Sequence, residues 1–268
     1  MKKVLLKRVA LFSASAIALA VAFAGVAFFF VMTRTGQGID QSAFNGARLG
    51  QRTVAPVALT LLDAIPITGV AIAVVVAIIV VMFRRNFRVL VVGVVAAGLA
   101  NVATQLVKNV FLARPDLGVS GYAENSLPSG HTTLAASAAL VVFLVSSPRF
   151  RPLVGVVGAI FATAVGVATL ANQWHRPSDV IAALLLVAFF GCLAGLALLA
   201  FRFVTAEPRR DMWSRMLLLL ALPCVGIAVA TILVAGLAPV AYIGAAAGIA
   251  ACALLLTAAA NHAFRTVL

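Results

Sequence analysis

Residues 175–200 read HRPSDVIAALLLVAFFGCLAGLALLA, a short polar stretch followed by an apolar run without a single charge. A helix of about 20 apolar residues is long enough to cross a hydrocarbon core about 30 Å thick. The run Val180–Ala200 therefore predicts a transmembrane helix. Pro177 fits the first turn of that helix, where its missing N–H removes no hydrogen bond. The polar residues before it are then expected at the membrane surface.

The rest of the chain has the same character, with 64% hydrophobic and 10% charged residues and a mean hydropathy of +1.16. Soluble domains are nearer to half apolar and a quarter charged. The predicted fold is therefore an all-α, polytopic membrane helical bundle. We expect about eight transmembrane helices: Val9–Met32, Pro66–Phe83, Val89–Val107, Thr132–Ser146, Leu153–Ala171, Val180–Ala200, Met216–Ala235 and Pro239–Ala260.

The chain begins with MKKVLLKR, a basic start of the kind found in signal peptides. The apolar run that follows is longer than the usual 7 to 15 residues, roughly, of such a peptide. We interpret it as an uncleaved first helix.

The net charge of +13 would suit a nucleic-acid partner, but its distribution argues against one. Alternate loops hold 14 of the 20 Lys and Arg residues, against only Glu207 and Asp211: Lys2, Lys3, Lys7, Arg8, Arg84, Arg85, Arg88, Arg149, Arg151, Arg202, Arg209, Arg210, Arg215 and Arg265. Positive loops mark the cytoplasmic side. Both termini are predicted inside a plasma membrane protein whose partner is the lipid bilayer.

The chain divides into a predicted core, residues 1–205, and two additional C-terminal helices, residues 206–268. Gly244 and Gly248 form a small-xxx-small pair that suits helix packing within the monomer and, as an alternative, dimerisation. The oligomeric state stays open. Cys192, Cys224 and Cys252 lie in apolar helices without metal-ligand spacing.

Of the outer loops, the first is the Gly-rich segment TRTGQGIDQSAFNGARLGQRTVAP, residues 33–56, which is able to fold over the outer face. The next two loops contain most of the unusual polar residues. They form three clusters at predicted helix ends on one membrane face: KNVFLARP from Lys108 to Pro115, PSGH from Pro128 to His131, and HRPSD from His175 to Asp179.

The PSGH cluster begins a helix, whose first amides lack internal partners and attract anions. Gly130 allows a ligand close to the backbone, Ser129 adds a hydroxyl, and His131 stands beside the anion. An idle interfacial histidine is the alternative. In the third cluster, Asp179 lies four residues after His175, a spacing at which helical side chains meet.

A carboxylate on one imidazole nitrogen fixes the tautomer and leaves the other nitrogen as a nucleophile. A pair that only anchors the helix is the alternative here. Lys108 and Arg114 add positive charge, and Arg matches phosphate with paired donors, although both also suit simple contact with lipid head groups.

These three clusters, in this order, resemble the signatures of the type 2 phosphatidic acid phosphatase superfamily, which includes membrane lipid phosphatases and vanadium haloperoxidases. The resemblance covers roughly Pro66 to Ala200, with the signatures between about 101 and 200, and implies a six-helix core. It implies that His175 attacks phosphorus, that Asp179 orients His175, and that His131 protonates the leaving oxygen and activates water. The resemblance further implies the phosphate ligands Lys108, Arg114, Ser129 and the Gly130 amide, and neither a metal nor another cofactor.

The sequence departs from the family pattern at two places. Five residues separate Lys108 from Arg114, where the family usually has six. Thr169 stands where the third signature has an Arg, so one phosphate contact is lost. Arg176 or Gln173 is a candidate substitute, and weaker activity is the alternative.

Two weaker signals remain. Asn101, Gln105 and Lys108 lie on one face of the third helix, which indicates interhelical hydrogen bonds or support of Lys108. Asp63 is an ionisable residue near a predicted helix end, where interfacial placement competes with a functional role.

The resemblance predicts a membrane phosphatase that acts on a lipid phosphomonoester or diphosphate at the outer face. Phosphatidic acid, phosphatidylglycerophosphate and polyprenyl diphosphate lie in the family's range. The alternatives are a phosphotransferase with the same histidines and a catalytically weakened lipid-phosphate binder. A haloperoxidase is disfavoured because that branch is soluble, and a transporter because no charge lies deep in a predicted span.

Overall fold

The structure, a computed structural model, describes residues 2–121, 124–201, 212–233, 238–265 and 267; for residues 2–3, 48–67, 233 and 238 it describes the backbone alone. Within these ranges the regular structure is helical, which confirms the all-α prediction. The helices are α1 (Lys2–Met32), α2 (Arg34–Arg84), α3 (Phe87–Leu106), the π-helix η1 (Val107–Phe111), α4 (Gly130–Val145), α5 (Arg151–Ala171), α6 (Pro177–Ala200), α7 (Met212–Leu233) and α8 (Ala238–Phe264).

Six of the described helices are long and apolar enough to cross a membrane: those beginning at Val4, Phe87, Arg151, Pro177, Met212 and Pro239. Two further helices predicted to cross are shorter, Thr68–Arg84 in the second half of α2 and Gly130–Val145. The chain is thus a multi-pass helical bundle of the kind that membranes hold.

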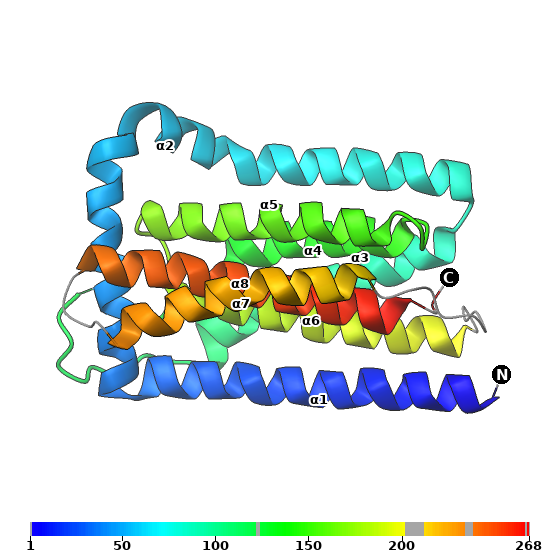
Figure 1. Cartoon of the computed structure of the whole chain (residues 1–268), viewed down its shortest axis with the longest axis horizontal. Coiled ribbons are helices and arrows are strands. Elements are labelled where there is room, and N and C mark those ends of the chain that lie inside the picture. Colours follow the sequence, from blue (N-terminus) through cyan, green and yellow to red (C-terminus); the bar gives the residue numbers. More distant parts are fainter. Residues whose placement is uncertain (1, 122–123, 202–211, 234–237, 266, 268) are drawn as a thin grey trace.

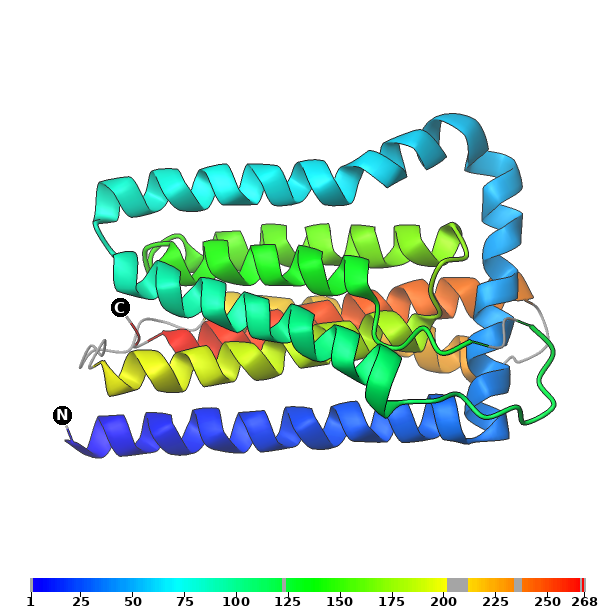
Figure 2. The same cartoon turned by 180° about the vertical axis from the view of Figure 1, so that it is seen from behind.

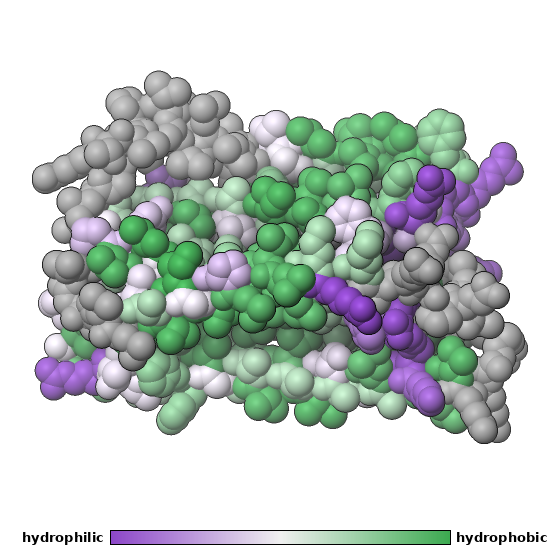
Figure 3. Space-filling view, in the orientation of Figure 1, coloured by the Kyte–Doolittle hydropathy of each residue, from purple (hydrophilic) through white to green (hydrophobic). Residues whose placement is uncertain are grey.

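The long helices run side by side, with the start of α1 and the end of α8 at one end of the bundle (Figure 1). The opposite end carries the starts of α4 and α6 and the 112–129 connection, as the reverse view also shows (Figure 2). Hydrophobic side chains cover the middle of the molecule between these ends, and the most hydrophilic ones gather at the end that carries the termini (Figure 3).

The segment from residue 33 to 56 was predicted to be a loop, and this prediction was wrong because α2 begins at Arg34. Thr33 caps it by accepting a hydrogen bond from the amide of Gly36 over 3.0 Å. The first part of α2 lies across the end of the bundle before the helix turns to run along it (Figures 1 and 2). Its buried positions 37, 40, 41, 44 and 47 recur at helical spacing. Three of these five residues are Gln37, Asp40 and Gln41, so hydrophobic periodicity did not reveal the helix.

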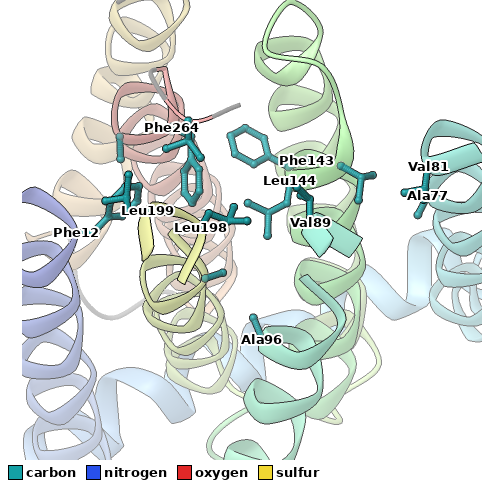
Figure 4. Packing of buried hydrophobic residues seen from close by; sticks show 14 residues of the cluster. Phe12, Ala77, Val81, Val89, Ala96, Phe143, Leu144, Leu198, Leu199 and Phe264 are labelled. Carbon is teal, nitrogen blue, oxygen red and sulfur yellow. The ribbon is translucent and has the colours of Figure 1, made fainter. Parts of the chain in front are cut away.

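Packing at the end with the termini centres on three phenylalanines from α1, α4 and α8 (Figure 4). The ring of Phe264 lies edge-on to Phe12 and Phe143, at 4.9 and 5.6 Å between centroids. Leu198 and Leu199 of α6 complete this core. Helix α8 is therefore an integral part of the bundle.

Two buried arginines hold the end of α8. Arg151 donates to the carbonyls of Leu144 at 3.0 Å and Val267 at 2.5 Å. It thus joins the end of α4 to the residues that follow α8. Arg8 of α1 donates to the carbonyl of His262 at 3.3 Å. Both side chains satisfy carbonyls that a helix end leaves without partners.

Helix α7 packs mainly against α8. At Gly244 of α8 the backbone comes so close to Thr231 of α7 that there is no room for a Cβ, and Gly248 faces Ala228. The predicted use of this small-residue pair in packing within the monomer is confirmed. Dimerisation, and the division of the chain at residue 205, stay predictions.

Candidate active site

The PSGH cluster begins a helix, as predicted. The buried Ser129 is the N-cap of α4, and its hydroxyl accepts from the amide of Thr132 at 3.3 Å. Its own amide donates to the carbonyl of Asp179 at 2.9 Å, which fixes the start of α4 to the start of α6. Gly130 and His131 then occupy the first turn, where amides point away from the helix toward any bound anion.

His175 and Asp179 meet as their spacing predicts. Nδ1 of His175 lies 3.3 Å from Oδ2 of Asp179, and both side chains are buried. The same oxygen accepts from the amide of Arg176 at 2.8 Å and from the hydroxyl of Ser126 at 2.6 Å. Asp179 is thus oriented by three groups, and the ring nitrogen Nε2 of His175 is the one directed away from the carboxylate.

The two signature histidines come from different helices and lie together. Their ring centroids are 6.0 Å apart, so that one small group is able to contact both. On its other side His131 lies against Trp174, at 5.2 Å between centroids, and Trp174 is 43% exposed. Trp174 was not among the predicted site residues, and only its place next to His175 in the sequence could have indicated it.

The first cluster reaches the same place. Lys108 lies in η1, where the amide of Leu112 bonds to the carbonyl of Val107 at 3.0 Å. Asn125 donates to the carbonyls of Lys108 at 3.2 Å and Leu112 at 2.8 Å. One amide side chain thus ties the end of η1 to the segment before PSGH. Such π-turns are rare and often occur at functional sites.

Arg114 lies within electrostatic reach of the buried groups. Partial burial lowers the pKa of its guanidinium below the usual range, and the nearby charge of Arg176 lowers it further, whereas Asp40 and Asp179 act in the opposite direction. Arg114 therefore interacts electrostatically with Arg176 and Asp179 of the third cluster, and its role as a phosphate ligand stays a prediction.

Asp40 of α2 is a site residue that the sequence reasoning missed. Its carboxylate accepts from the amide of Ser178 at 3.0 Å and from the Ser178 hydroxyl at 2.5 Å. It caps the first turn of α6 from outside. Burial raises the pKa of Asp40 to about 7, and the negative charge of Asp179 raises it in the same direction.

Thr169 does not reach toward an anion, since its buried hydroxyl donates to the carbonyl of Gly166 at 2.8 Å. Its carbonyl accepts from the amides of Trp174 and His175, at 3.0 and 3.3 Å. Of the two candidate substitutes, Gln173 donates from Nε2 to the carbonyl of Phe44 at 3.0 Å, so this group is directed to α2. The side chain of Arg176 is buried and bonds to Gln41 and Ser126.

The polar stripe on α3 is partly explained. Asn101 donates to the hydroxyl of Ser137 on α4 at 3.2 Å, which confirms an interhelical hydrogen bond. Gln105 accepts from Asn109 at 3.2 Å and lies beside Gly130. The side chain of Asp63 falls outside the described residues. Among the residues that the structure describes, no three His, Cys, Asp or Glu side chains form a cluster able to hold a metal ion.

Comparison with known proteins agrees with this geometry. The model of the PAP2 superfamily matches residues 89–203, a range that contains all three clusters. A search of curated proteins and a search of solved structures found no match. Over residues 89–203 this chain is therefore similar to the PAP2 superfamily, as a member of that superfamily would be.

Proposed function

We propose that the protein is a membrane phosphatase that hydrolyses the phosphomonoester or diphosphate of a membrane lipid through a phosphohistidine. The observation that carries the proposal is the pair His175–Asp179 with His131 at 6.0 Å between the histidine rings. This is an oriented nucleophile beside a second group that is able to carry a proton. The similarity of residues 89–203 to a phosphatase-type superfamily supports the same reaction class.

In the proposed reaction, Nε2 of His175 attacks phosphorus while Asp179 accepts a hydrogen bond from the protonated Nδ1 of the same ring. His131 gives a proton to the leaving oxygen, and the lipid alcohol or phosphate departs. His131 then removes a proton from water as the water oxygen attacks phosphorus. The new phosphorus–oxygen bond replaces the phosphorus–nitrogen bond, and phosphate leaves His175. Phosphoryl transfer needs in-line positioning and stabilisation of charge on the equatorial oxygens, and these groups can supply both.

The phosphate oxygens are proposed to meet the first-turn amide of Gly130, the hydroxyl of Ser129 and the cations Lys108 and Arg114. The lowered pKa of Arg114 supports this assignment. An anion bound beside this guanidinium would stabilise its charged form, because an opposite charge offsets the effects of burial and of the nearby Arg176.

A lipid substrate is proposed because the clusters lie at the end of a bundle of apolar helices, close to where head groups would lie. A phosphate carried by a lipid is held at this depth by the bilayer itself. The outer face is proposed because the loops at the opposite end are the more basic ones.

The test is phosphate release by the protein purified in detergent, with a chelator present. The substrates are phosphatidic acid, phosphatidylglycerophosphate and a polyprenyl diphosphate. We expect His175→Ala to abolish release and His131→Ala to lower kcat by about 100- to 10,000-fold, the range for general acid–base groups. His262→Ala, a change of the third histidine at the far end of α8, is the matched control and should keep wild-type activity.

Absence of release from every lipid, or release that survives His175→Ala, would contradict the proposed mechanism. Thr169 favours one other outcome, a binder with weak turnover, because its hydroxyl is bonded within α5 instead of contacting an anion. Lipid-phosphate binding without release would support that reading. Phosphate found on an added alcohol would identify a transferase.

A further inference from the structure

The first part of α2 contacts the site through one buried face. Gln37 donates to the carbonyl of Pro115 at 3.0 Å, directly after Arg114. Asp40 accepts a hydrogen bond from Ser178 of α6, and the carbonyl of Phe44 accepts one from the side chain of Gln173. The face therefore touches both the first and the third cluster, although it lies outside residues 89–203, the matched range.

Gln41 is the residue of this face that binds the charged side chain of Arg176. Its Oε1 accepts from both Nε and NH2 of Arg176, each at 3.4 Å, and its Nε2 donates to Asn45 Oδ1 at 3.1 Å. The bond to Asn45 sets the orientation of the amide, so that the oxygen faces the guanidinium. The Phe44 ring lies 5.7 Å from the same guanidinium carbon, at a distance that favours a cation.

A glycine from the 112–129 connection packs against the amide of Gln41. Gly121 has a φ of +140°, and a Cβ at this position would overlap the Gln41 side chain. Gln41 is thus enclosed between its own helix, Arg176 and a residue that has to be small. It is 5% exposed, which shields its bonds to Arg176 from water.

From Arg176 the bonds continue to the nucleophile. NH1 of Arg176 donates to the hydroxyl of Ser126 at 3.2 Å. Ser126 has one hydroxyl hydrogen, and this hydrogen must go to Oδ2 of Asp179, because an ionised carboxylate only accepts. Asp179 in turn accepts from Nδ1 of His175.

We propose that Gln41 is a positioning residue for His175 and acts through Arg176, Ser126 and Asp179. This inference rests on the proposed function, in which His175 is the nucleophile. Gln41 holds Arg176 by accepting from it, and beyond Arg176 the donors Nη1 of Arg176, the Ser126 hydroxyl and Nδ1 of His175 all act toward Asp179. Chains of buried hydrogen bonds of this kind strengthen one another. With Oδ2 fixed by Ser126 and the Arg176 amide, His175 presents Nδ1–H to the carboxylate and keeps Nε2 free of hydrogen. Arg176 is then a support of the nucleophile instead of a phosphate ligand.

The test compares three variants of the full-length protein. Gln41→Leu removes the acceptor for Arg176 at similar volume, and Gln41→Glu keeps an acceptor oxygen. Gln37→Leu is the matched control: the same residue type, one turn earlier on the same buried face, which loses its bonds to the carbonyls of Val31 and Pro115 instead.

Two measurements are made on each variant. The first is the pair kcat and KM for the best lipid substrate. The second is nitrogen NMR of histidine-labelled protein, which distinguishes the two neutral tautomers without turnover. With three histidines in the chain, His175→Gln assigns the signal of residue 175.

We expect Gln41→Leu to lower kcat about 10-fold at unchanged KM, because it removes the two long hydrogen bonds that hold the charged side chain of Arg176. Its His175 signal should become a mixture of tautomers. Gln41→Glu and Gln37→Leu should keep the single tautomer with Nδ1–H. A wild-type spectrum in Gln41→Leu, or equal changes in Gln41→Leu and Gln37→Leu, would overturn the inference.

The two hypotheses fail in different ways. If the wild type releases no phosphate from any lipid, the proposed function fails, and the tautomer measurement alone decides the role of Gln41. If the wild type is active and Gln41→Leu matches it in both kcat and spectrum, the proposed function survives and the positioning role is refuted.

Discussion

Asp40 shows how one residue links the first part of α2 to the start of α6. Its carboxyl group is buried and binds Ser178, while the negative charge of Asp179 repels it and the positive charge of Arg176 attracts it. Burial is the largest effect and raises its pKa from 3.8 to about 7. A carboxyl that takes up a proton near neutral pH makes the stability of the fold depend on pH.

The direction follows from the raised pKa. Between pH 4 and pH 7, approximately, the folded protein keeps a proton on Asp40 that the unfolded protein releases, so the free energy of unfolding falls as the pH rises. In Asp40→Asn this dependence should disappear, because the amide cannot ionise and still offers an oxygen to the Ser178 amide. Thermal unfolding followed by fluorescence of the two tryptophans, at pH 5 and pH 8, tests this.

We expect the midpoint of the wild type to fall more between these pH values than the midpoint of Asp40→Asn. Asp116→Asn, which removes an exposed carboxyl in the 112–129 connection, is the control and should behave as the wild type. Equal pH dependence in all three proteins would contradict the raised pKa.

At the scale of elements, the starts of α4 and α6 were predictable because their signals are local. Ser129 caps a helix, Pro177 fits a first turn, and His175 and Asp179 lie four residues apart. The first part of α2 has one such signal, the Thr33 cap, but no local pattern that shows how its helix continues. Its buried face includes Gln37, Asp40 and Gln41, whose partners are backbone and side-chain groups from distant parts of the chain. Nothing in a local pattern shows that these partners exist.

The contact between α7 and α8 provides a prediction for an element outside the matched range. Gly244→Ala places a methyl group against Oγ1 of Thr231, which forces the two helices apart. Overpacking of this kind costs about 1 to 3 kcal/mol. We expect a lower unfolding midpoint for Gly244→Ala and partial recovery in the double variant with Thr231→Ala, which removes the nearest obstructing atom, Oγ1, but leaves the Cβ of residue 231.

Activity separates this effect from damage to the site. Because α7 packs mainly against α8, phosphate release per folded molecule should stay at the wild-type level in Gly244→Ala. If the two substitutions instead destabilise additively, Gly244 and Thr231 do not meet, and the packing of α7 on α8 is different from the one described.

For the whole molecule, the charge pattern and the fold agree on a division between two ends. The connection between α4 and α5, which contains Arg149, lies at the end with the termini, and the PSGH and HRPSD clusters lie at the other (Figure 1). Some of the cations at the first end also have structural partners. Arg8 and Arg151 are buried and hold backbone carbonyls at the end of α8 and beyond it. The charge count that predicts topology thus includes residues that also stabilise the fold.

Sidedness is tested by labelling two ends of one molecule. In a background with Cys192, Cys224 and Cys252 replaced by Ala, a single cysteine is introduced at Asp116 or at Arg149, both exposed positions. The excess of basic residues at the Arg149 end predicts that this end faces the cytoplasm.

In intact cells a membrane-impermeant maleimide should label Asp116→Cys, and it should reach Arg149→Cys only after permeabilisation. Labelling of Arg149→Cys alone in intact cells would show the opposite orientation in the membrane, with the histidines on the cytoplasmic side. The proposed chemistry would then stand, but the substrate would have to be a lipid phosphate of the inner leaflet.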